Sequence, residues 1–524
     1  MAVKMTGGQA LVHALYREGV RVIFGLPGVQ QYHAVDAVYR EPRIRYISTR
    51  HEQATSYMAD GYARVSGDIA AVMVVPGPGL FNAAGGIATA YAASSPMLVV
   101  TGEHDRDGAG SDEMDFLRPI TKWTARAPRP ADVPAIVREA FRQLRTGRPR
   151  PVEIELSPEV LAEATEVEPL EPETHQPPGG AGEQIEKAAH SLAEAQKSAI
   201  WAGGGAISSG ASAVLQQLAE HLQAAVVTSP NGKGAISDRH PLSLGMAELR
   251  YEPLRQWLAG CDVILAIGTR TSFADRLRDQ QVIRIDIDQA EIERQHHHTF
   301  GIVGDARRTL EALYRLVATA TPPGPSRERE VRELNTARFA PEGQLEPQHS
   351  FMTAIRSVLP NDGILVQGMN QMGYYSRNYY PVHTPGTYLT ASSHGTLGSA
   401  FPLALGAKVA KPDRAVVALS GDGGFLYNSQ ELATAVQYGI SVVVIVFDDH
   451  AFGNVLRAQI EEFDGHVIGT KLHNPDFVKL AEVYGARGVR ARDADQLEGA
   501  LREALSIEAP TVIEVPVGTM ERRY

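Results

Sequence analysis

Short apolar runs alternate with amphipathic segments of helical periodicity in the first part of the chain. Apolar runs at 20–24, 45–49, 70–75, 97–101 and 152–156 predict five buried strands, and the segments between them predict helices, the first over 8–18. Strands that alternate with helices in this way are typical of a parallel, doubly wound sheet. The first block of the chain is therefore predicted to form one such domain.

The same alternation returns in two later blocks. In the middle block, strands are predicted at 198–202, 224–227, 263–267 and 282–285, and in the last block at 364–367, 415–419 and 442–447. The segments 166–182 and 320–348 are rich in proline, charged residues or glycine and are interpreted as linkers, of which the first is expected to be extended. We therefore predict an α/β protein of three doubly wound parallel-sheet domains, at 1–165, 184–320 and 346–524.

Composition agrees with this plan and excludes several classes of partner. The 524 residues suit three domains of roughly 150 residues each. The formal net charge of −11 argues against binding nucleic acid or an anionic membrane, which are themselves negatively charged. No apolar run approaches the roughly 18 residues of a membrane span, and Met1 leads into the first helix without a signal-peptide core. With Cys261 as its only cysteine the chain cannot form an internal disulfide, so we expect a cytoplasmic protein.

The strongest chemical signal follows two neighbouring strands of the last block. Gly421-Asp422-Gly423 comes after one apolar run, and Asp448-Asp449 comes after the next, with 24 residues between the two motifs. Residues 428–431 have a capping-box pattern that predicts the start of the intervening helix. The carboxyl ends of parallel strands share one edge, where ligands bind. Glycines there let backbone N–H groups approach a phosphate, and carboxylates suit Mg²⁺. The pattern predicts a metal–diphosphate cradle, although an ordinary polar turn remains an alternative.

This cradle resembles the thiamine diphosphate (ThDP) signature, in which Gly-Asp-Gly is followed, after a spacer of this length, usually by Asn-Asn. Here both asparagines are aspartates, so Asp449 takes the place of the second one and adds negative charge beside the diphosphate. The resemblance implies that Asp422, Asp449 and the carbonyl of Ala451 bind the metal. It also implies coenzyme contacts from Gly421, Asp422, Gly423, Gly424, Asp449, Ala451, Phe452 and Gly453.

The first and middle blocks are similar to the same family. Pro27-Gly28, Glu52 in Arg50-His51-Glu52-Gln53, and Pro76-Gly77-Pro78-Gly79 with Asn82 resemble the pyrimidine-binding domain, in the order that the family shows. The middle block matches at Asn231-Gly232-Lys233-Gly234, Asp286-Ile287-Asp288 and Gly304-Asp305. Within the family, the resemblance is closest to acetolactate synthase and related 2-oxo acid decarboxylases and carboligases.

The resemblance implies roles for several of these residues. Glu52 would hydrogen-bond N1′ of the aminopyrimidine and so activate the coenzyme, because burial of a carboxyl group in an apolar pocket lets it share a proton. Taken alone, a glutamate at a helix start is more often a cap or an ion-pair partner. Leu397 would hold the coenzyme in a V shape, with Gly395 beside it; core packing is the alternative. Further coenzyme contacts are expected from Pro27, Gly28, Asn82, Asn370 and Gln371.

Substrate-side residues are less clearly marked. Gln30 and Gln31 follow Pro27-Gly28 and are candidates for hydrogen-bonding a 2-oxo acid, with a solvated loop as the alternative. Val75 stands where related decarboxylases place a histidine, and His104 and His394 are the remaining candidates. His394 is equally well explained as a hydrogen-bonded support. Few proton donors are evident, which favours ligation to a second carbonyl over protonation and aldehyde release. The stretch 105–118, which includes Glu113 and Asp115, departs from acetolactate synthases.

We therefore expect a ThDP- and Mg²⁺-dependent enzyme that decarboxylates a 2-oxo acid and forms a carbon–carbon bond. A decarboxylase that releases an aldehyde, a flavin-linked 2-oxo acid oxidase and a non-catalytic ThDP-binding protein are the alternatives. The Gly203 turn, Arg270 and Arg276 are compatible with FAD, but the segment after Met246 departs from a flavin-binding pattern, so FAD is not expected. The run 296–298 of three histidines is interpreted as a surface loop. The resemblance also implies a homodimer or homotetramer with active sites between subunits.

Overall fold

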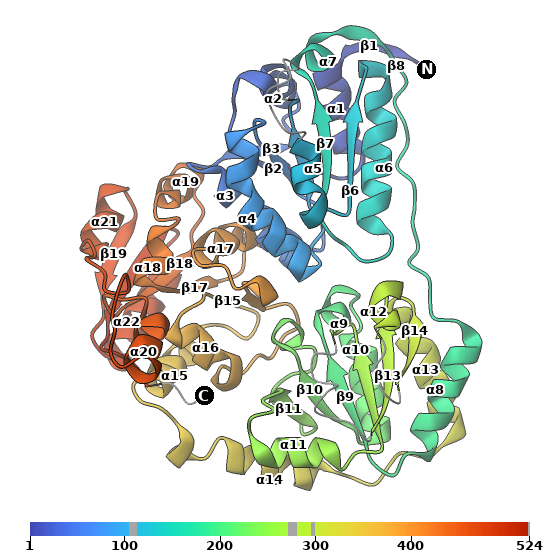
Figure 1. Ribbon diagram of the computed structural model, residues 1–524, viewed down its shortest axis with the longest axis vertical. Coiled ribbons are helices and arrows are strands. Elements are labelled where there is room, and N and C mark those ends of the chain that lie inside the picture. Colours follow the sequence, from blue (N-terminus) through green and yellow to red (C-terminus); the bar gives the residue numbers. More distant parts are fainter. Residues whose placement is uncertain (104–112, 271–279, 295–298, 522–524) are drawn as a thin grey trace. The chain divides into compact units, whose positions relative to one another are not determined.

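The computed structural model describes residues 1–103, 113–270, 280–294 and 299–521. Three six-stranded sheets carry this part of the chain, one in each predicted block (Figure 1). Their strands pair in parallel, as in the pairing of β2 with β3, β9 with β12, and β17 with β18. The predicted α/β class with three parallel sheets is confirmed. No helix in the described part of the chain is long and apolar enough to span a bilayer.

The first sheet has the strand order β3-β2-β4-β5-β7-β6. Its strands are β2 (Val22–Gly25), β3 (Arg45–Ser48), β4 (Ala71–Met73), β5 (Leu98–Thr101), β6 (Trp123–Ala127) and β7 (Val152–Leu156). The inner strands β4, β5 and β7 are buried along their whole length, which is why they are apolar runs in the sequence. A separate antiparallel pair, β1 (Val3–Thr6) with β8 (Ala164–Val167), extends into the predicted first linker.

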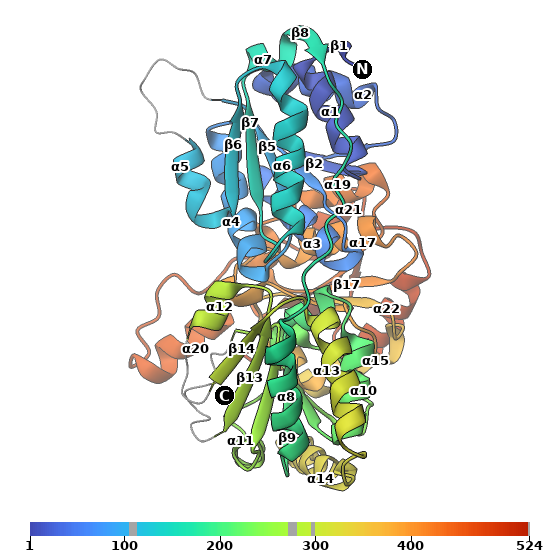
Figure 2. The same ribbon diagram turned by 90° about the vertical axis from the view of Figure 1, so that its right-hand side faces the viewer.

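Helices cover both faces of the first sheet (Figure 2). On one face pack α1 (Gly7–Arg17), α2 (Tyr32–Tyr39) and α6 (Val133–Arg145), and on the other α3 (Glu52–Ser66) and α4 (Pro78–Ala93). Two short helices, α5 (Glu113–Leu117) and α7 (Pro158–Ala162), complete the domain. The first helix begins where Thr6 and Gln9 form a capping box.

The central sheet has the order β11-β10-β9-β12-β13-β14. Its strands are β9 (Ser198–Ala202), β10 (Ala225–Thr228), β11 (Ser243–Met246), β12 (Val263–Ile267), β13 (Gln281–Asp286) and β14 (Thr299–Val303). The helices are α8 (Gly182–Glu194), α9 (Gly204–Ser208), α10 (Ser212–Leu222), α11 (Glu252–Ala259), α12 (Gln289–Glu293) and α13 (Ala306–Ala320). The Gly203 turn packs tightly on the turn after β12, since a Cβ on Gly203 would lie 2.2 Å from the carbonyl oxygen of Gly268.

The third sheet has the order β16-β15-β17-β18-β20-β19. Its strands are β15 (Ile364–Gln367), β16 (Tyr388–Thr390), β17 (Val416–Gly421), β18 (Val443–Asp448), β19 (Arg487–Arg490) and β20 (Thr511–Pro516). The helices are α15 (Gln348–Val358), α16 (Gln371–Tyr379), α17 (Ala400–Ala410), α18 (Asp422–Leu426), α19 (Glu431–Tyr438), α20 (Gly453–Glu462), α21 (Phe477–Val483) and α22 (Ala494–Leu505).

Two helices of different blocks pack closely against each other, α3 of the first and α17 of the third (Figures 1 and 2). A Cβ on Gly61 would lie 2.1 Å from the carbonyl oxygen of Leu403, and one on Gly406 would lie 1.9 Å from that of Met58. Glycine is therefore required at both contact points. The third block thus packs directly on the helix that begins at Glu52.

One sequence expectation is corrected, and one helix is found that the sequence does not predict. The helix predicted to start at 428–431 is α19, which begins at Glu431 without a side-chain cap, because Asn428 and Glu431 are used in contacts with distant residues. The second linker, 320–348, contains a helix that the sequence pattern does not predict, α14 (Glu328–Arg338). Arg338 at the end of α14 is buried and donates to the carbonyl oxygens of Leu244 and Met246, which anchors this helix on the central domain.

The described chain divides into two compact units. The first comprises Met1–His175, Leu365–Asn370 and Ala391–Thr519, and the second comprises Gln176–Ile364, Gln371–Thr390 and Met520–Tyr524, of which the structure describes the residues up to 521. Both predicted halves of the coenzyme site, the edge at Glu52 and the edge at Asp422, belong to the first unit.

Candidate coenzyme site

The turn after β17 is closely packed around Gly423. Gly421 ends the strand, and the buried Asp422 is the first residue of α18. A Cβ on Gly423 would lie 2.5 Å from Cε1 of Phe452 and 2.9 Å from Cδ1 of Leu472, whereas the nearest atom to one on Gly424 would be 3.6 Å away. The ring of Phe452 therefore lies directly against Gly423, and the turn has no space for a larger residue there.

The two predicted metal-binding carboxylates converge on one backbone group. Ala451 donates its N–H to Asp422 Oδ2 (3.2 Å) and to Asp449 Oδ1 (3.3 Å). The other oxygen of Asp449 lies against Gly453, the first residue of α20, where a Cβ would be only 2.1 Å from it. The structure thus brings together Asp422, Asp449 and Ala451, as well as the glycines at the start of two helices, whose N-terminal ends favour an anion.

Burial alters the acidity of both carboxyl groups. Loss of hydration raises the pKa of Asp422 to about 6, and the nearby Asp449 and Asp448 add to the rise. Burial also raises the pKa of the Asp449 carboxyl group above its ordinary value. An adjacent cation would reverse this effect, because it stabilises the charged form of a carboxylate.

The donor set fits a hard cation that shares its coordination with a ligand. In the described ranges, no group of three or more His, Cys, Asp or Glu side chains is arranged to hold a metal ion. Two carboxylates and a backbone carbonyl would leave positions for phosphate oxygens and water, which is how Mg²⁺ is commonly held beside a diphosphate. The residues at this turn therefore fit Mg²⁺ bound together with the coenzyme.

Sequence reasoning missed one residue of this cluster. Asn474, in the loop before α21, donates from Nδ2 to Asp422 Oδ2 (2.6 Å) and to Asp448 Oδ1 (2.7 Å). The backbone N–H of His450 also donates to Asp448 Oδ1 (3.1 Å). No motif marks Asn474 in the sequence, because it lies 52 residues beyond Asp422 in an unpatterned loop.

The loop after β15 lies at the same edge of the third sheet. After β15, Asn370 donates to the carbonyl oxygen of Leu419 (3.0 Å), and its Cβ would be 3.2 Å from a Cβ on Gly421. Asn370 is therefore beside the Gly-Asp-Gly turn, although part of its amide supports the end of β17. The neighbouring Gln371 begins α16, which belongs to the second unit.

The loop that contains Leu397 has a glycine with positive φ on either side of that residue. Gly395 has φ 66° and Gly398 has φ 77°. Asn428 donates from Nδ2 to the carbonyl oxygen of Gly398 (2.8 Å), which attaches the loop to the end of the α18 segment. Leu397 is partly exposed rather than buried in the core, and His394 is exposed. A purely core role for Leu397 is thus not supported.

The predicted activating glutamate lies in a small cluster at the edge of the first sheet. Glu52 is the first residue of α3, and Asn82 donates to its Oε2 (3.0 Å). A Cβ on Gly28 would lie 2.3 Å from Cγ1 of Val75, and a Cβ on Gly79 would lie 2.7 Å from the other methyl of Val75 and 3.5 Å from Glu52 Oε1. These residues, together with Pro27 at the end of the turn after β2, are therefore brought together.

The two glutamines after Pro27-Gly28 have different surroundings. Gln31 is buried, and its amide donates to the carbonyl oxygen of Val74, so it supports the sheet. Gln30 is partly exposed, and its Cβ would lie 3.0 Å from a Cβ on Gly102. Gln30 keeps its place as a substrate-side candidate, and the structure assigns Gln31 a supporting position. His104, Arg276 and the histidines at 296–298 lie outside the described residues.

Residues on both sides of Glu52 contact the third block of the same chain. Glu431, fully buried at 0% exposure, accepts the backbone N–H groups of Arg50 (3.1 Å) and His51 (3.0 Å). Gln53 donates to the carbonyl oxygen of Tyr427 (2.9 Å) and to Asn428 Oδ1 (3.0 Å). Burial raises the pKa of the Glu431 carboxyl group. These contacts hold the start of α3, while the carboxylate of Glu52 itself contacts Asn82.

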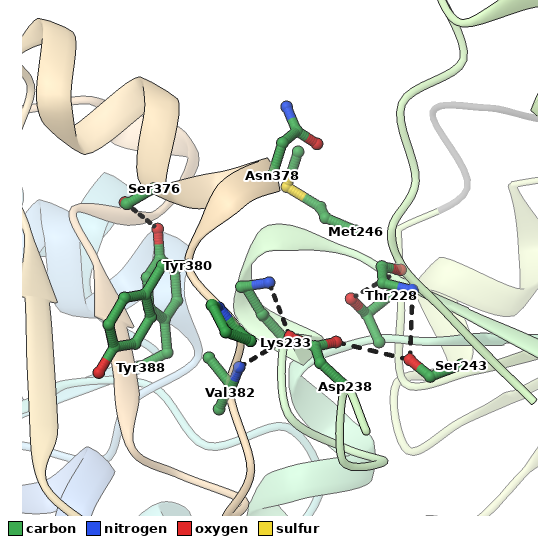
Figure 3. Close-up of polar contacts among 12 residues, drawn as sticks. Thr228, Lys233, Asp238, Ser243, Met246, Ser376, Asn378, Tyr380, Val382 and Tyr388 are labelled. Atoms are coloured by element: carbon green, nitrogen blue, oxygen red, sulfur yellow. Dashed lines mark hydrogen bonds and ion pairs between the residues drawn. The ribbon is translucent and has the colours of Figure 1, made fainter. Parts of the chain in front are cut away.

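The Asn231–Gly234 motif has a structural explanation in the second unit (Figure 3). Lys233 is buried, with Nζ 3.0 Å from Asp238 Oδ2, and the N–H of Val382 donates to the same oxygen (2.8 Å). The N–H of Asp238 in turn donates to the carbonyl oxygen of Val382 (2.8 Å). This buried ion pair joins the central domain to the segment that leads to β16, a role in fixing geometry that does not require large net stabilisation.

Comparison with known proteins agrees with the geometry of both edges. Three family models match the chain, namely the N-terminal TPP (thiamine pyrophosphate) binding domain over 5–121, the central domain over 185–313 and the C-terminal TPP binding domain over 368–515 of thiamine pyrophosphate enzymes. A probable acetolactate synthase large subunit of Methanocaldococcus jannaschii is 37% identical over 99% of this chain and 93% of its own length.

Two other relatives differ in their named reaction. A probable 2-ketoarginine decarboxylase of Pseudomonas aeruginosa is 35% identical over 98% of this chain and 94% of its own length. The acetolactate synthase large subunit of Haemophilus influenzae is 33% identical over 99% of this chain and 96% of its own length. With all three domains matched in order and relatives aligned over nearly the whole length, the chain belongs to the family of thiamine pyrophosphate enzymes, as the resemblance of its motifs predicts.

Proposed function

We propose that the protein is a ThDP- and Mg²⁺-dependent enzyme that decarboxylates a 2-oxo acid and joins the remaining carbon unit to a second carbonyl compound. The observation that carries this proposal is the convergence of Asp422 and Asp449 on the N–H of Ala451, beside a turn in which Gly423 has no space for a side chain. The acetolactate synthases among its relatives support the ligation step.

The third block would bind the diphosphate end. Asp422, Asp449 and the carbonyl of Ala451 would hold Mg²⁺, and the N–H groups of Gly423, Gly424 and Gly453 would donate to phosphate oxygens. Phe452 and Gly421 shape this turn, and Asn370 supports the end of β17 beside it. When bound, the coenzyme supplies the electron sink for loss of carbon dioxide.

The first block would act on the pyrimidine end. Glu52 would hold or release a proton at N1′, and Asn82 orients its carboxylate through the hydrogen bond to Oε2. Val75 supplies apolar surroundings on one side of the carboxylate. Leu397 would support the bent coenzyme between its two rings, with Gly395 shaping the loop and Pro27 and Gly28 lining the edge.

The substrate side favours ligation. Gln30, which is partly exposed, would hydrogen-bond the 2-oxo acid, and the exposed His394 is a candidate for a proton donor. Val75, where related decarboxylases place a histidine, cannot donate a proton. Few proton donors would leave the bound carbon unit free to attack a second carbonyl compound.

A simple decarboxylase is the second candidate. The probable 2-ketoarginine decarboxylase is as similar to this chain as several of the acetolactate synthases are. That relative supports a reaction in which the carbon unit is protonated and released as an aldehyde.

The active site is proposed to form between two copies of the chain in a homodimer or homotetramer, with Glu52 from one copy and the Asp422 cradle from the other. The absence of a possible internal disulfide suits the cytoplasm as its location.

Product analysis distinguishes the two candidates. The full-length protein is incubated with ThDP, Mg²⁺ and a panel of 2-oxo acids, including one with a guanidinium group, with and without carbonyl acceptors. NMR then identifies the products. Ligation products support the proposal, aldehydes alone support the second candidate, and no turnover with any acid would argue against both.

The role of Glu52 has its own test. Glu52→Gln should lower turnover by about 10²- to 10⁴-fold, because it removes the proton-sharing group at N1′. Thermal stability and ThDP affinity should remain close to those of the unmodified protein. Glu159→Gln, which alters an exposed carboxylate in the first turn of α7, is the matched control and should keep full turnover. Unchanged turnover in Glu52→Gln would remove the glutamate from the mechanism.

A further inference from the structure

Asn474 connects two buried carboxylates that no local motif links to it. Its Nδ2 lies 2.6 Å from Asp422 Oδ2 and 2.7 Å from Asp448 Oδ1. Both carboxylates are nearly inaccessible, with Asp422 2% and Asp448 4% exposed. We propose that Asn474 is a positioning residue that holds Asp422 in place for the cation by bridging it to Asp448. This inference rests on the proposed function, because it assigns Asp422 to the Mg²⁺ site.

The bridge answers an electrostatic problem that Asp448 creates. Two carboxylates close together in surroundings with little water repel each other when both are charged. An asparagine in place of Asp448 could donate a hydrogen bond to Asp422 directly, whereas an ionised aspartate can only accept. The NH₂ group of Asn474 has two hydrogens, one for each carboxylate, so a single side chain satisfies both acceptors.

The bridge also fixes the orientation of Asp422. Its Oδ2 accepts one hydrogen bond from Asn474 and another from the backbone N–H of Ala451. Two donors on one oxygen restrict rotation of the carboxylate, which pre-organises it for a cation. Groups that hydrogen-bond a metal-binding side chain typically contribute about 10- to 100-fold in metal affinity.

If Asn474 served only to hold its loop, its loss would disrupt the fold of that loop. The surrounding loop is held by its backbone, since Leu472 donates its N–H to the carbonyl oxygen of His450 (2.7 Å) and Phe452 donates to that of Thr470 (2.8 Å). Asp476 caps the following helix through the N–H of Lys479. Loss of the Asn474 side chain should therefore leave the loop folded, and a change in metal affinity would report on the bridge.

The experiment combines Asn474→Ala with Asp448→Asn in a double-mutant cycle. Mg²⁺ is titrated calorimetrically into each full-length protein at saturating ThDP, and the thermal midpoint of each metal-free protein is measured. Asn474→Ala should weaken Mg²⁺ binding at least tenfold and lower the thermal midpoint. Asp448→Asn should have little effect alone, but in the Asn474→Ala background it should restore most of both losses, because the introduced amide can then donate to Asp422.

Asn361→Ala, at an exposed asparagine, is the matched control and should change neither quantity. Mg²⁺ binding by Asn474→Ala within twofold of the unmodified protein would overturn the inference. So would additive effects of the two substitutions, because residues that act through one bridge must show coupling. If the unmodified protein binds no ThDP, the proposed function fails, and the metal-free thermal cycle still decides whether the bridge exists.

Discussion

The carboxyl group of Asp422 combines burial with a position between two other acids. Its pKa is raised to about 6, mainly by loss of hydration, with Asp449 and Asp448 contributing in the same direction. The sequence predicts the place of this residue at the edge of the sheet, because the Gly-Asp-Gly motif directly follows an apolar run. It cannot predict the raised pKa, which depends on burial of the carboxyl group in the folded chain and which the hydrogen bond from Asn474 partly opposes.

This pKa predicts how the metal-free protein responds to pH. A carboxyl group whose pKa is higher in the folded than in the unfolded state stabilises the fold at low pH, and this contribution is lost as pH rises through the folded value. For Asp422 the loss runs from about pH 4 to about pH 6, so the thermal midpoint of Asp422→Asn relative to that of the unmodified protein should rise over this range and stay level above it. Thermal unfolding of both proteins without metal measures the difference. Parallel pH profiles would show that the carboxyl group titrates normally.

At the scale of elements, periodicity locates all but one of the inner strands and misses most of the edge strands. The inner strand β20 is not predicted, although five of its six residues are buried. The edge strands β6, β11, β14, β16 and β19 escape sequence prediction because several of them are short or only partly buried and lack a continuous apolar run. The capping-box prediction at 428–431 is wrong because the side chains of Asn428 and Glu431 bind groups elsewhere in the chain. A local sequence pattern cannot show that a capping side chain will instead bind a residue that is distant in sequence.

The loop around Leu397 offers a matched pair of substitutions. Alanine at Gly395 or Gly398 would have to adopt a positive φ, which costs about 1–2 kcal/mol. At Gly398 the new Cβ would also lie 2.5 Å from Cβ of Tyr427, whereas at Gly395 the nearest atom is the flexible end of Met369 at 3.3 Å. Gly398→Ala should therefore destabilise the protein by about 1–3 kcal/mol more than Gly395→Ala does, as measured by urea unfolding. Equal losses would mean that the loop is not held against Tyr427.

For the whole molecule, the arrangement of the sheet edge that carries Glu52 and the sheet edge that carries Asp422 decides whether one chain suffices for activity. Within a chain, Glu431 and Asn428 hold the residues on either side of Glu52, while the carboxylate of Glu52 contacts Asn82. These contacts make the start of α3 dependent on the third block of its own chain. The proposed site then takes Glu52 from one copy and the cradle from another, so each copy serves two sites.

Co-expression of two inactive variants tests this arrangement. A Glu52→Gln chain and an Asp422→Ala chain carry different tags, and mixed dimers are purified through both tags. If the site is shared, one of the two sites in a mixed dimer has both intact residues, and about half of the normal activity should return, whereas each variant alone stays inactive. Inactive mixed dimers would place Glu52 and Asp422 of one site in the same chain.

The sequence by itself determined the α/β class, most of the inner strands of three sheets and the motifs at two sheet edges. These features follow from short-range regularities, since an apolar run buries a strand and a motif at its end inherits the position of that strand. Only the tertiary structure decided that Asn474 bridges Asp422 and Asp448, that Glu431 holds the turn before Glu52, and that Gln31 supports the sheet instead of facing a substrate. Partners such as Glu431 and His51 are 380 residues apart, and their meeting depends on how whole helices and sheets pack, which no local pattern encodes.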